Sequence, residues 1–191
     1  MFDSVINNAT VVDGNGGEPF NANVAVRDGK IAAIGSEAYV GRETIDGNNK
    51  ILTPGFVDIH THYDGQATWD DLLAPSAHHG VTTAVMGNCG VGFAPVRPGK
   101  QKFLVELMEG VEDIPGSALA DGIDWAWESF PEYLDALDKT GRAINIAAQV
   151  PHGALRAYVF DNEGAVNAPA TPSQIDQMAE LAKEAVQAGA V

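Results

Sequence analysis

Two histidines one residue apart follow a short apolar stretch in this chain. Residues 56–59 favour a strand that ends at His60 and His62. Side chains two residues apart on a strand point to the same side, so both imidazoles are expected to face one space. Neutral imidazole is a common ligand for divalent metals such as Zn²⁺. A solvated or hydrogen-bonded histidine pair is the alternative, and the neighbouring Asp58 and Asp64 favour metal.

The single cysteine, Cys89, lies in a glycine-rich loop, residues 87–92, after a second predicted strand, residues 81–86. Carboxyl ends of successive parallel strands lie at the same end of a sheet, so Cys89 is expected beside His60 and His62. Thiolate is a normal zinc ligand, although a lone cysteine is more often an inert apolar residue. The loop lacks the Lys-Ser/Thr ending of a phosphate-binding loop.

The segments that carry these residues resemble known motifs. Pro-Gly-Phe-Val-Asp-Ile-His-Thr-His, residues 54–62, is similar to the first barrel strand of the amidohydrolase superfamily of metal-dependent hydrolases. Gly-Asn-Cys-Gly-Val-Gly-Phe-Ala-Pro, residues 87–95, resembles more narrowly the N-acyl-D-amino-acid deacylases, or D-aminoacylases. Residues 107–116 and 124–130 resemble the same family, so the likeness extends over nearly the whole chain.

The resemblance implies a zinc-dependent hydrolase that cleaves a linear amide, converting an N-acyl-D-amino acid to a carboxylate and a D-amino acid. It implies His60, His62 and Cys89 as ligands of one tight Zn²⁺ site, with room for a second, weaker one. The family's general base and two further histidine ligands would lie beyond Val191. We therefore assign no catalytic base, and we expect the chain to be an N-terminal portion that is inactive alone.

Supporting roles are expected for residues around these motifs. Tyr63 and Trp69, in the polar loop after the histidines, are expected to contact substrate, with covering the barrel mouth as the structural alternative. His152 opens a His-Gly-x-Leu-Arg segment typical of the family and is expected to contact substrate or support a ligand. Asp58 and Asp64 are expected to support the ligands by hydrogen bonds rather than to bind the metal.

Several other polar and aromatic residues are expected to be structural. The histidines at 78–79 precede Gly80 and suit a helix C-terminus, where a cationic side chain is favourable. Arg156 is expected in an ion pair, and the acidic residues of 109–113, Asp113 among them, on a solvated face. For the tryptophans of 125–127, packing and a substrate pocket are equally open.

The elements that position these residues indicate an α/β fold. The expected fold is the first part of a metal-dependent-hydrolase (β/α)8, or TIM-like, barrel preceded by part of a small β-sandwich domain. Residues 1–52 are expected to supply the sandwich part. Residues 53–191 are expected to supply the first three β/α units, with an insertion at about residues 97–128 and a third strand at residues 143–150.

Turn and cap signals divide these regions further. The N-terminal region is predicted to hold two short runs, residues 5–6 and 10–12, a hairpin at Asp28-Gly29, and a last strand at residues 48–52. One helix is predicted to begin near Ser129 and to close at Gly141, and another to run from Thr171 to Gly189. The second helix has an apolar stripe that predicts core packing.

Composition narrows the partners and the compartment. The chain has 191 residues, 45% of them hydrophobic, and a net charge of −15, so nucleic acid is not an expected partner. No apolar run reaches the ~18 residues of a membrane span, and the N-terminus lacks the basic region of a signal peptide, so a soluble cytoplasmic protein is expected. The expected ligand is a small N-acyl amino acid.

Other functions remain open on the sequence. A closed barrel typically takes ~250 residues, so the remainder of the barrel could come from a second chain or a homo-oligomer. The chain could instead belong to a cyclic-amide amidohydrolase such as a hydantoinase or dihydroorotase. It could also be a non-catalytic fragment or a metal-binding scaffold that needs a partner chain.

Overall fold

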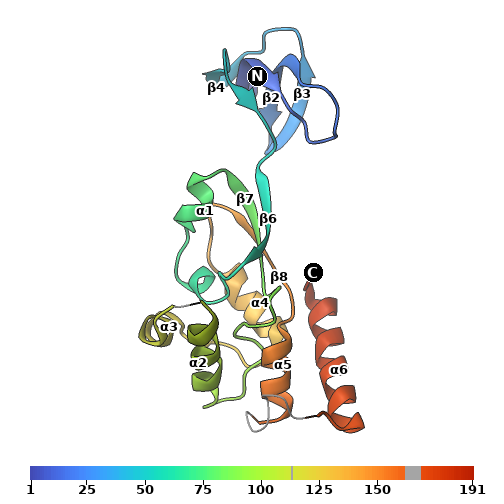
Figure 1. The fold of residues 1–191 in the computed structure, drawn as a ribbon. Helices are drawn as coiled ribbons and strands as arrows, with labels where there is room; N and C mark the ends of the chain where they lie inside the picture. The colour runs from blue at the N-terminus through green and yellow to red at the C-terminus, as the bar shows by residue number, and fades with distance from the viewer. Residues whose placement is uncertain (113, 162–168) are drawn as a thin grey trace. The chain divides into compact units, whose positions relative to one another are not determined.

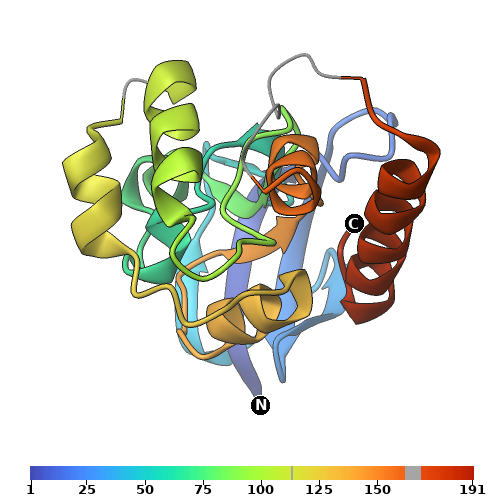
Figure 2. The ribbon, with the colours of Figure 1, turned by 90° about the horizontal axis from the view of Figure 1, so that it is seen from below.

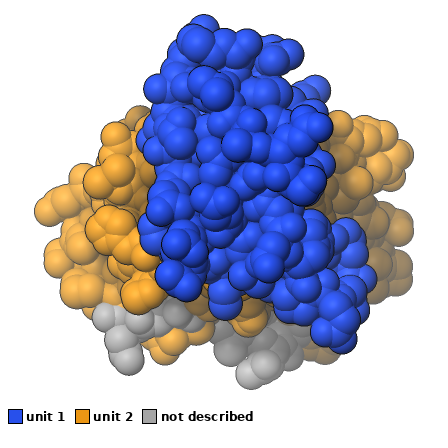
Figure 3. Space-filling model, turned by 90° about the horizontal axis from the view of Figure 1, so that it is seen from above, with its two compact units in different colours: residues 1–55 blue, residues 56–191 orange. Residues whose placement is uncertain are grey.

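The computed structural model describes residues 1–112, 114–161 and 169–191, so Asp113 lies outside the described residues. The chain divides into two compact units, residues 1–55 and 56–191, coloured separately in Figure 3.

Unit 1 is a five-stranded sheet of order β3-β2-β1-β4, with β5 also paired to β1 (Figure 1). Its strands are β1 Phe2–Val11, β2 Phe20–Arg27, β3 Lys30–Gly35, β4 Gly41–Asp46 and β5 Ile51–Leu52. Asp28 and Gly29 join β2 to β3 with φ of 53° and 70°, which confirms the predicted hairpin. The region holds one sheet, and a second layer of a sandwich stays a prediction.

In unit 1 one expectation is wrong, and one strand was not predicted. The run at 5–6 and all but the last residue of the run at 10–12 belong to one strand, β1, because Asn8 takes a φ of 63° and the register shifts as a bulge without ending the strand. Strand β4 was not expected because its sequence, Gly-Arg-Glu-Thr-Ile-Asp, is mostly polar. It forms because its backbone pairs in parallel with β1.

The bulge is held by a buried amide, that of Asn23, which is 6% exposed. Its Nδ2 donates to the carbonyls of Ser36 at 3.2 Å and Glu37 at 2.8 Å, and its Oδ1 accepts from the Asn8 N–H at 2.6 Å. We expect Asn23→Ala to lower the free energy of unfolding in urea by about 2 kcal/mol or more, because it removes all three hydrogen bonds of the buried amide. Asn21→Ala, at an exposed position of the same strand, is the control, and equal midpoints for both variants would contradict the prediction.

Unit 2 is built on a three-stranded parallel sheet of order β6-β7-β8. The strands are β6 Phe56–Thr61, β7 Val81–Met86 and β8 Asn145–Ala148. Predicted strand 81–86 is confirmed at both ends, whereas the third strand is shorter than predicted. The helices are η1 Gln66–Thr68, α1 Ala74–His78, α2 Gln101–Glu112, α3 Gly116–Gly122, α4 Phe130–Asp138, α5 His152–Val159 and α6 Pro172–Ala188.

The helix starts follow the predicted caps. Ser129 and Thr171 each form a capping box that opens α4 and α6, and Gly189 closes α6 with a φ of 120°. The predicted close of α4 at Gly141 is wrong, because the helix ends at Asp138 and Lys139 is its C-cap. Helices α2 and α3 occupy the stretch expected as an insertion.

The apolar stripe of α6 contributes to the core only in part, through Ala185, so the prediction of core packing is wrong for the rest of the stripe. Of its residues only Ala185 is buried, and Ile175 is 53% exposed. Figure 2 shows α6 at the edge of unit 2, and its contacts are with α4 and α5. One side of its apolar face is therefore left uncovered by the described residues.

The main core of unit 2 lies between the sheet and helices α2 to α5. It contains a group of aromatic residues from the loop after β7, from the chain leading into α4 and from α4 itself: Phe93, Trp125, Trp127, Phe130 and Tyr133. In the part of the chain that the structure covers, no helix is both long and apolar enough to cross a membrane.

Candidate metal centre

The structure brings His60, His62 and Cys89 together at the carboxyl ends of β6 and β7. His60 is the second-last residue of strand β6, and His62 directly follows that strand. Cys89 lies three residues after the end of β7. The two imidazole centroids are 5.3 Å apart, and Cys89 Sγ lies 3.6 Å from His62 Nδ1. One ligand atom from each residue lies within 4.8 Å of the others.

This donor set fits zinc. Tetrahedral zinc with Zn–S bonds of about 2.3 Å and Zn–N bonds of about 2.0–2.1 Å puts sulfur and nitrogen about 3.6 Å apart. The Cys89–His62 separation is 3.6 Å, and the His60 ligand atom lies within 4.8 Å of the other two. Three ligands leave a fourth position open, which is the arrangement of catalytic zinc sites. His60 and Cys89 are exposed, so the open side faces solvent.

Hydrogen bonds near the ligands tie the two strands to each other. The Asn88 amide, next to Cys89, donates to the Ile59 carbonyl at 3.1 Å, and the Thr61 hydroxyl donates to the Val85 carbonyl at 2.8 Å. Sequence reasoning missed Asn88 and Thr61. Their positions beside the ligands were the signal available.

The glycines after β7 allow this loop to pass close to its neighbours. Gly87 has a φ of 87°, and a Cβ at this position would lie 2.4 Å from the Gln149 carbonyl oxygen. The Gly90 carbonyl accepts from the Gly153 N–H at 2.7 Å, at the start of α5. The loop that carries Cys89 is therefore held against the chain that follows β8.

The two aspartates expected to support the ligands lie in different surroundings. Asp58 Oδ1 accepts from the His60 backbone N–H at 3.2 Å, so it contacts the strand and not the imidazole. Asp64 is 3% exposed and packs against Gly92 of the Cys89 loop. A Cβ added to Gly92 would lie 2.9 Å from Asp64 Oδ1. Support of the ligands by these residues stays a prediction.

The three expected substrate contacts are also in different places. The Tyr63 hydroxyl shares a hydrogen bond with Ser76 Oγ at 2.7 Å, which directs it towards α1. Trp69 is 43% exposed and lies against Gly122 of α3, where a Cβ would be 2.9 Å from its ring. His152 is exposed at the start of α5, beside the Cys89 loop.

The residues expected to be structural lie in different surroundings. His78 ends α1 and His79 is its C-cap. Trp127 is buried and its indole N–H donates to the Phe93 carbonyl at 2.8 Å, so packing is the better interpretation for this residue. The Arg156 guanidinium lies over the Phe160 ring, 4.5 Å from its centroid.

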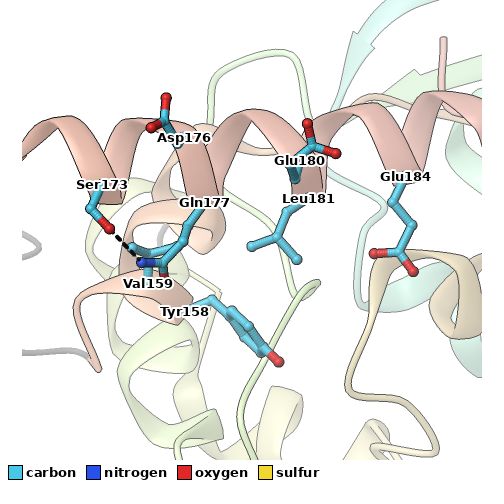
Figure 4. A pocket seen from close by; sticks show the side chains of 8 residues that line it. All are labelled: Tyr158, Val159, Ser173, Asp176, Gln177, Glu180, Leu181 and Glu184. Carbon is cyan, nitrogen blue, oxygen red and sulfur yellow. Dashed lines mark hydrogen bonds between the residues drawn. The ribbon is translucent and has the colours of Figure 1, made fainter.

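A groove of about 610 Å³ lies between α5 and α6 (Figure 4). Its lining residues come from these two helices: Tyr158, Val159, Ser173, Asp176, Gln177, Glu180, Leu181 and Glu184. None of them is a candidate ligand, so the groove is separate from the metal centre.

Known proteins resemble this chain in sequence and in fold. The sequence profile of the Amidohydrolase family matches residues 43–191. D-aminoacylase from Alcaligenes xylosoxydans xylosoxydans is 34% identical over 191 residues, covering 100% of this chain and 37% of that protein. A solved D-aminoacylase, described with a binuclear metal center, superposes on 100% of this chain and 38% of its own, with a TM-score of 0.81 and 34% identity.

A further solved relative carries a metal. N-acyl-D-glutamate deacylase from Bordetella bronchiseptica, complexed with zinc and a phosphonate inhibitor, is 32% identical with a TM-score of 0.74 over 100% of this chain and 37% of its own. The chain thus spans little more than a third of these relatives. The superpositions confirm the amidohydrolase fold for the part that is present.

Proposed function

Because this chain belongs to the amidohydrolase family, we propose that it supplies the first metal ligands of a zinc-dependent deacylase of N-acyl-D-amino acids. The observation that carries the proposal is the convergence of His60, His62 and Cys89 at the carboxyl ends of adjacent parallel strands. That end is where catalytic groups of β/α barrels lie. The identity of 34% to a D-aminoacylase over the whole chain supports the substrate class.

In the proposed reaction His60, His62 and Cys89 hold the metal with one side open to solvent. Bound zinc would polarise the amide carbonyl of the substrate and lower the pKa of water. Asn88 and Thr61 keep the two ligand-bearing strands in register through their bonds to Ile59 and Val85. We also propose that His152 contacts the substrate, because its side chain is exposed beside this end of the sheet.

No residue in this chain is proposed as the general base. Asp58 already accepts a backbone hydrogen bond, and Asp64 is buried beneath the loop that carries Cys89. A base must reach the proton that it removes, within about 3 Å or through one water. A base from outside residues 1–191 accords with the chain's coverage of 37% of the related D-aminoacylase.

The proposal is tested by turnover of the protein made from the complete open reading frame. With added zinc we expect acetate release from N-acetyl-D-methionine, at least about tenfold faster than from N-acetyl-L-methionine, and little opening of hydantoin. Chelation should abolish the activity and zinc should restore it. Preferential opening of hydantoin or dihydroorotate would support the cyclic-amide alternative instead.

Residues 1–191 alone provide the second arm of this test. We expect them to bind zinc without turnover, because three ligands suffice to hold a metal and the base is absent. Zinc-dependent, D-selective turnover by a monomer of residues 1–191 would contradict the assignment and place the base within this chain.

A further inference from the structure

Two chain segments carry the metal ligands, and both are anchored from within the core. The histidine arm is residues 60–65, and the cysteine arm is residues 87–93. The arms run into the interior beyond their ligands, where Asp64 and Phe93 are buried. Zinc needs the ligand atoms of Cys89 and His62 about 3.6 Å apart, so metal binding requires a fixed distance between the two arms.

A buried aromatic pair from the chain around the start of α4 contacts both arms. Trp127 Nε1 donates to the Phe93 carbonyl of the cysteine arm at 2.8 Å. The Tyr133 hydroxyl donates to the Asp64 carbonyl of the histidine arm, also at 2.8 Å. The two rings pack against each other with centroids 5.0 Å apart. The pair therefore connects one arm to the other through two hydrogen bonds and one ring contact.

The Tyr133 hydroxyl is a permanent donor. Tyr133 is 2% exposed, and its burial, together with the negative charge of Asp64, raises its pKa well above the ordinary value of 10.0. The phenol thus stays protonated throughout the physiological pH range. Removing the Tyr133 hydroxyl would leave the buried Asp64 carbonyl without this hydrogen bond, which costs free energy.

The arms also pack directly on each other, so little slack remains between them. A Cβ on Gly65 would lie 2.9 Å from the Phe93 ring, and a Cβ on Gly92 would lie 2.9 Å from Asp64 Oδ1. At such close packing a shift of either anchor changes the separation of the arms rather than being absorbed by a void.

We propose that Trp127 and Tyr133 are positioning residues of the metal centre, which hold the cysteine arm and the histidine arm at the spacing that a divalent metal requires. The inference rests on the proposed metal site of His60, His62 and Cys89. It adds two residues that lie some forty positions beyond Cys89 and touch no ligand atom. They act through the carbonyls of Phe93 and Asp64.

The test compares Tyr133→Phe with Tyr158→Phe in the purified protein. Each change removes one phenol hydroxyl, but that of Tyr158 bonds the Glu128 carboxylate at 2.8 Å and neither arm. The readouts are the Cd²⁺ dissociation constant, by competition with a chromophoric chelator, and the ultraviolet absorption of the cadmium–thiolate bond. Both are measured where every variant is fully folded, so a loss of global stability alone leaves them unchanged.

We expect Tyr133→Phe to weaken Cd²⁺ binding about tenfold or more and to reduce the cadmium–thiolate absorption. A loss of affinity of this size is typical when a residue that orients metal ligands is replaced. Tyr158→Phe should match the wild type. Trp127→Phe is the second variant and should weaken binding similarly. Equal affinity in the wild type, Tyr133→Phe and Trp127→Phe would overturn the inference, as would a wild type that binds no Cd²⁺.

Hydrolysis is not read in this experiment, so the two proposals fail separately. A protein that binds Cd²⁺, loses affinity on Tyr133→Phe and yet hydrolyses no N-acyl-D-amino acid would refute the proposed substrate while supporting the positioning role.

Discussion

Replacing Cys89 with alanine is expected to strip tightly bound zinc more completely than replacing His62. In the proposed site Cys89 would supply a thiolate, the one ligand of the three that carries a negative charge, because zinc deprotonates a coordinating thiol outright. The resemblance to D-aminoacylases also assigns the cysteine to the tighter metal position. We expect a loss of affinity beyond about 100-fold, above the range for residues that only support a ligand.

Metal analysis after exhaustive dialysis measures this effect in the Cys89→Ala and His62→Ala proteins. His79→Ala is the matched control, since His79 is an exposed histidine at the end of α1 and should leave the zinc content at the wild-type level. Equal zinc retention in the cysteine and histidine variants would count against Cys89 as the tighter ligand.

Gly87→Ala is expected to have the largest effect on the fold around the site. Gly87 has a φ of 87°, where L side chains are strained, and an added Cβ would lie 2.4 Å from the Gln149 oxygen and 3.1 Å from its carbonyl carbon. Both obstacles are backbone atoms, so no side-chain rotation relieves the clash. We expect a loss of at least about 3 kcal/mol in the free energy of unfolding, or no soluble protein.

Urea unfolding of Gly87→Ala beside Gly110→Ala checks this prediction. Gly110 lies within α2, where an added Cβ meets nothing within 4 Å, so alanine there should be neutral or should stabilise by about 1 kcal/mol. A Gly87→Ala protein with the wild-type midpoint would show that the loop after β7 can move away from Gln149.

The strands and the ligand group were the predictable part of this structure. Val81–Met86 is rich in β-branched residues, so local preference and tertiary structure agree there. His60, His62 and Cys89 converge because successive parallel strands place their carboxyl ends at one end of the sheet, a rule that needs no side-chain detail. The sequence thus predicted which three residues meet.

Other features depend on tertiary contacts that local pattern does not encode. Strand β4 is mostly polar and is a strand only because β1 pairs with it. The stripe of α6 has helical spacing, but its burial depends on neighbours that contact only one side of the helix. Trp127 and Tyr133 have ordinary core character in the sequence, and only the structure reveals that they bond Phe93 and Asp64.

An ion bound by both His62 and Cys89 would also reduce the conformational entropy of the unfolded chain. The two residues are 27 positions apart, so any ion held by both closes a loop of that length. By the polymer relation used for covalent cross-links, closing such a loop removes chain entropy from the denatured ensemble worth about 3.5 kcal/mol at 25 °C. A metal at this site would therefore act as a reversible cross-link between the segments that follow β6 and β7. Chelation would lower the stability of the fold as well as remove the activity.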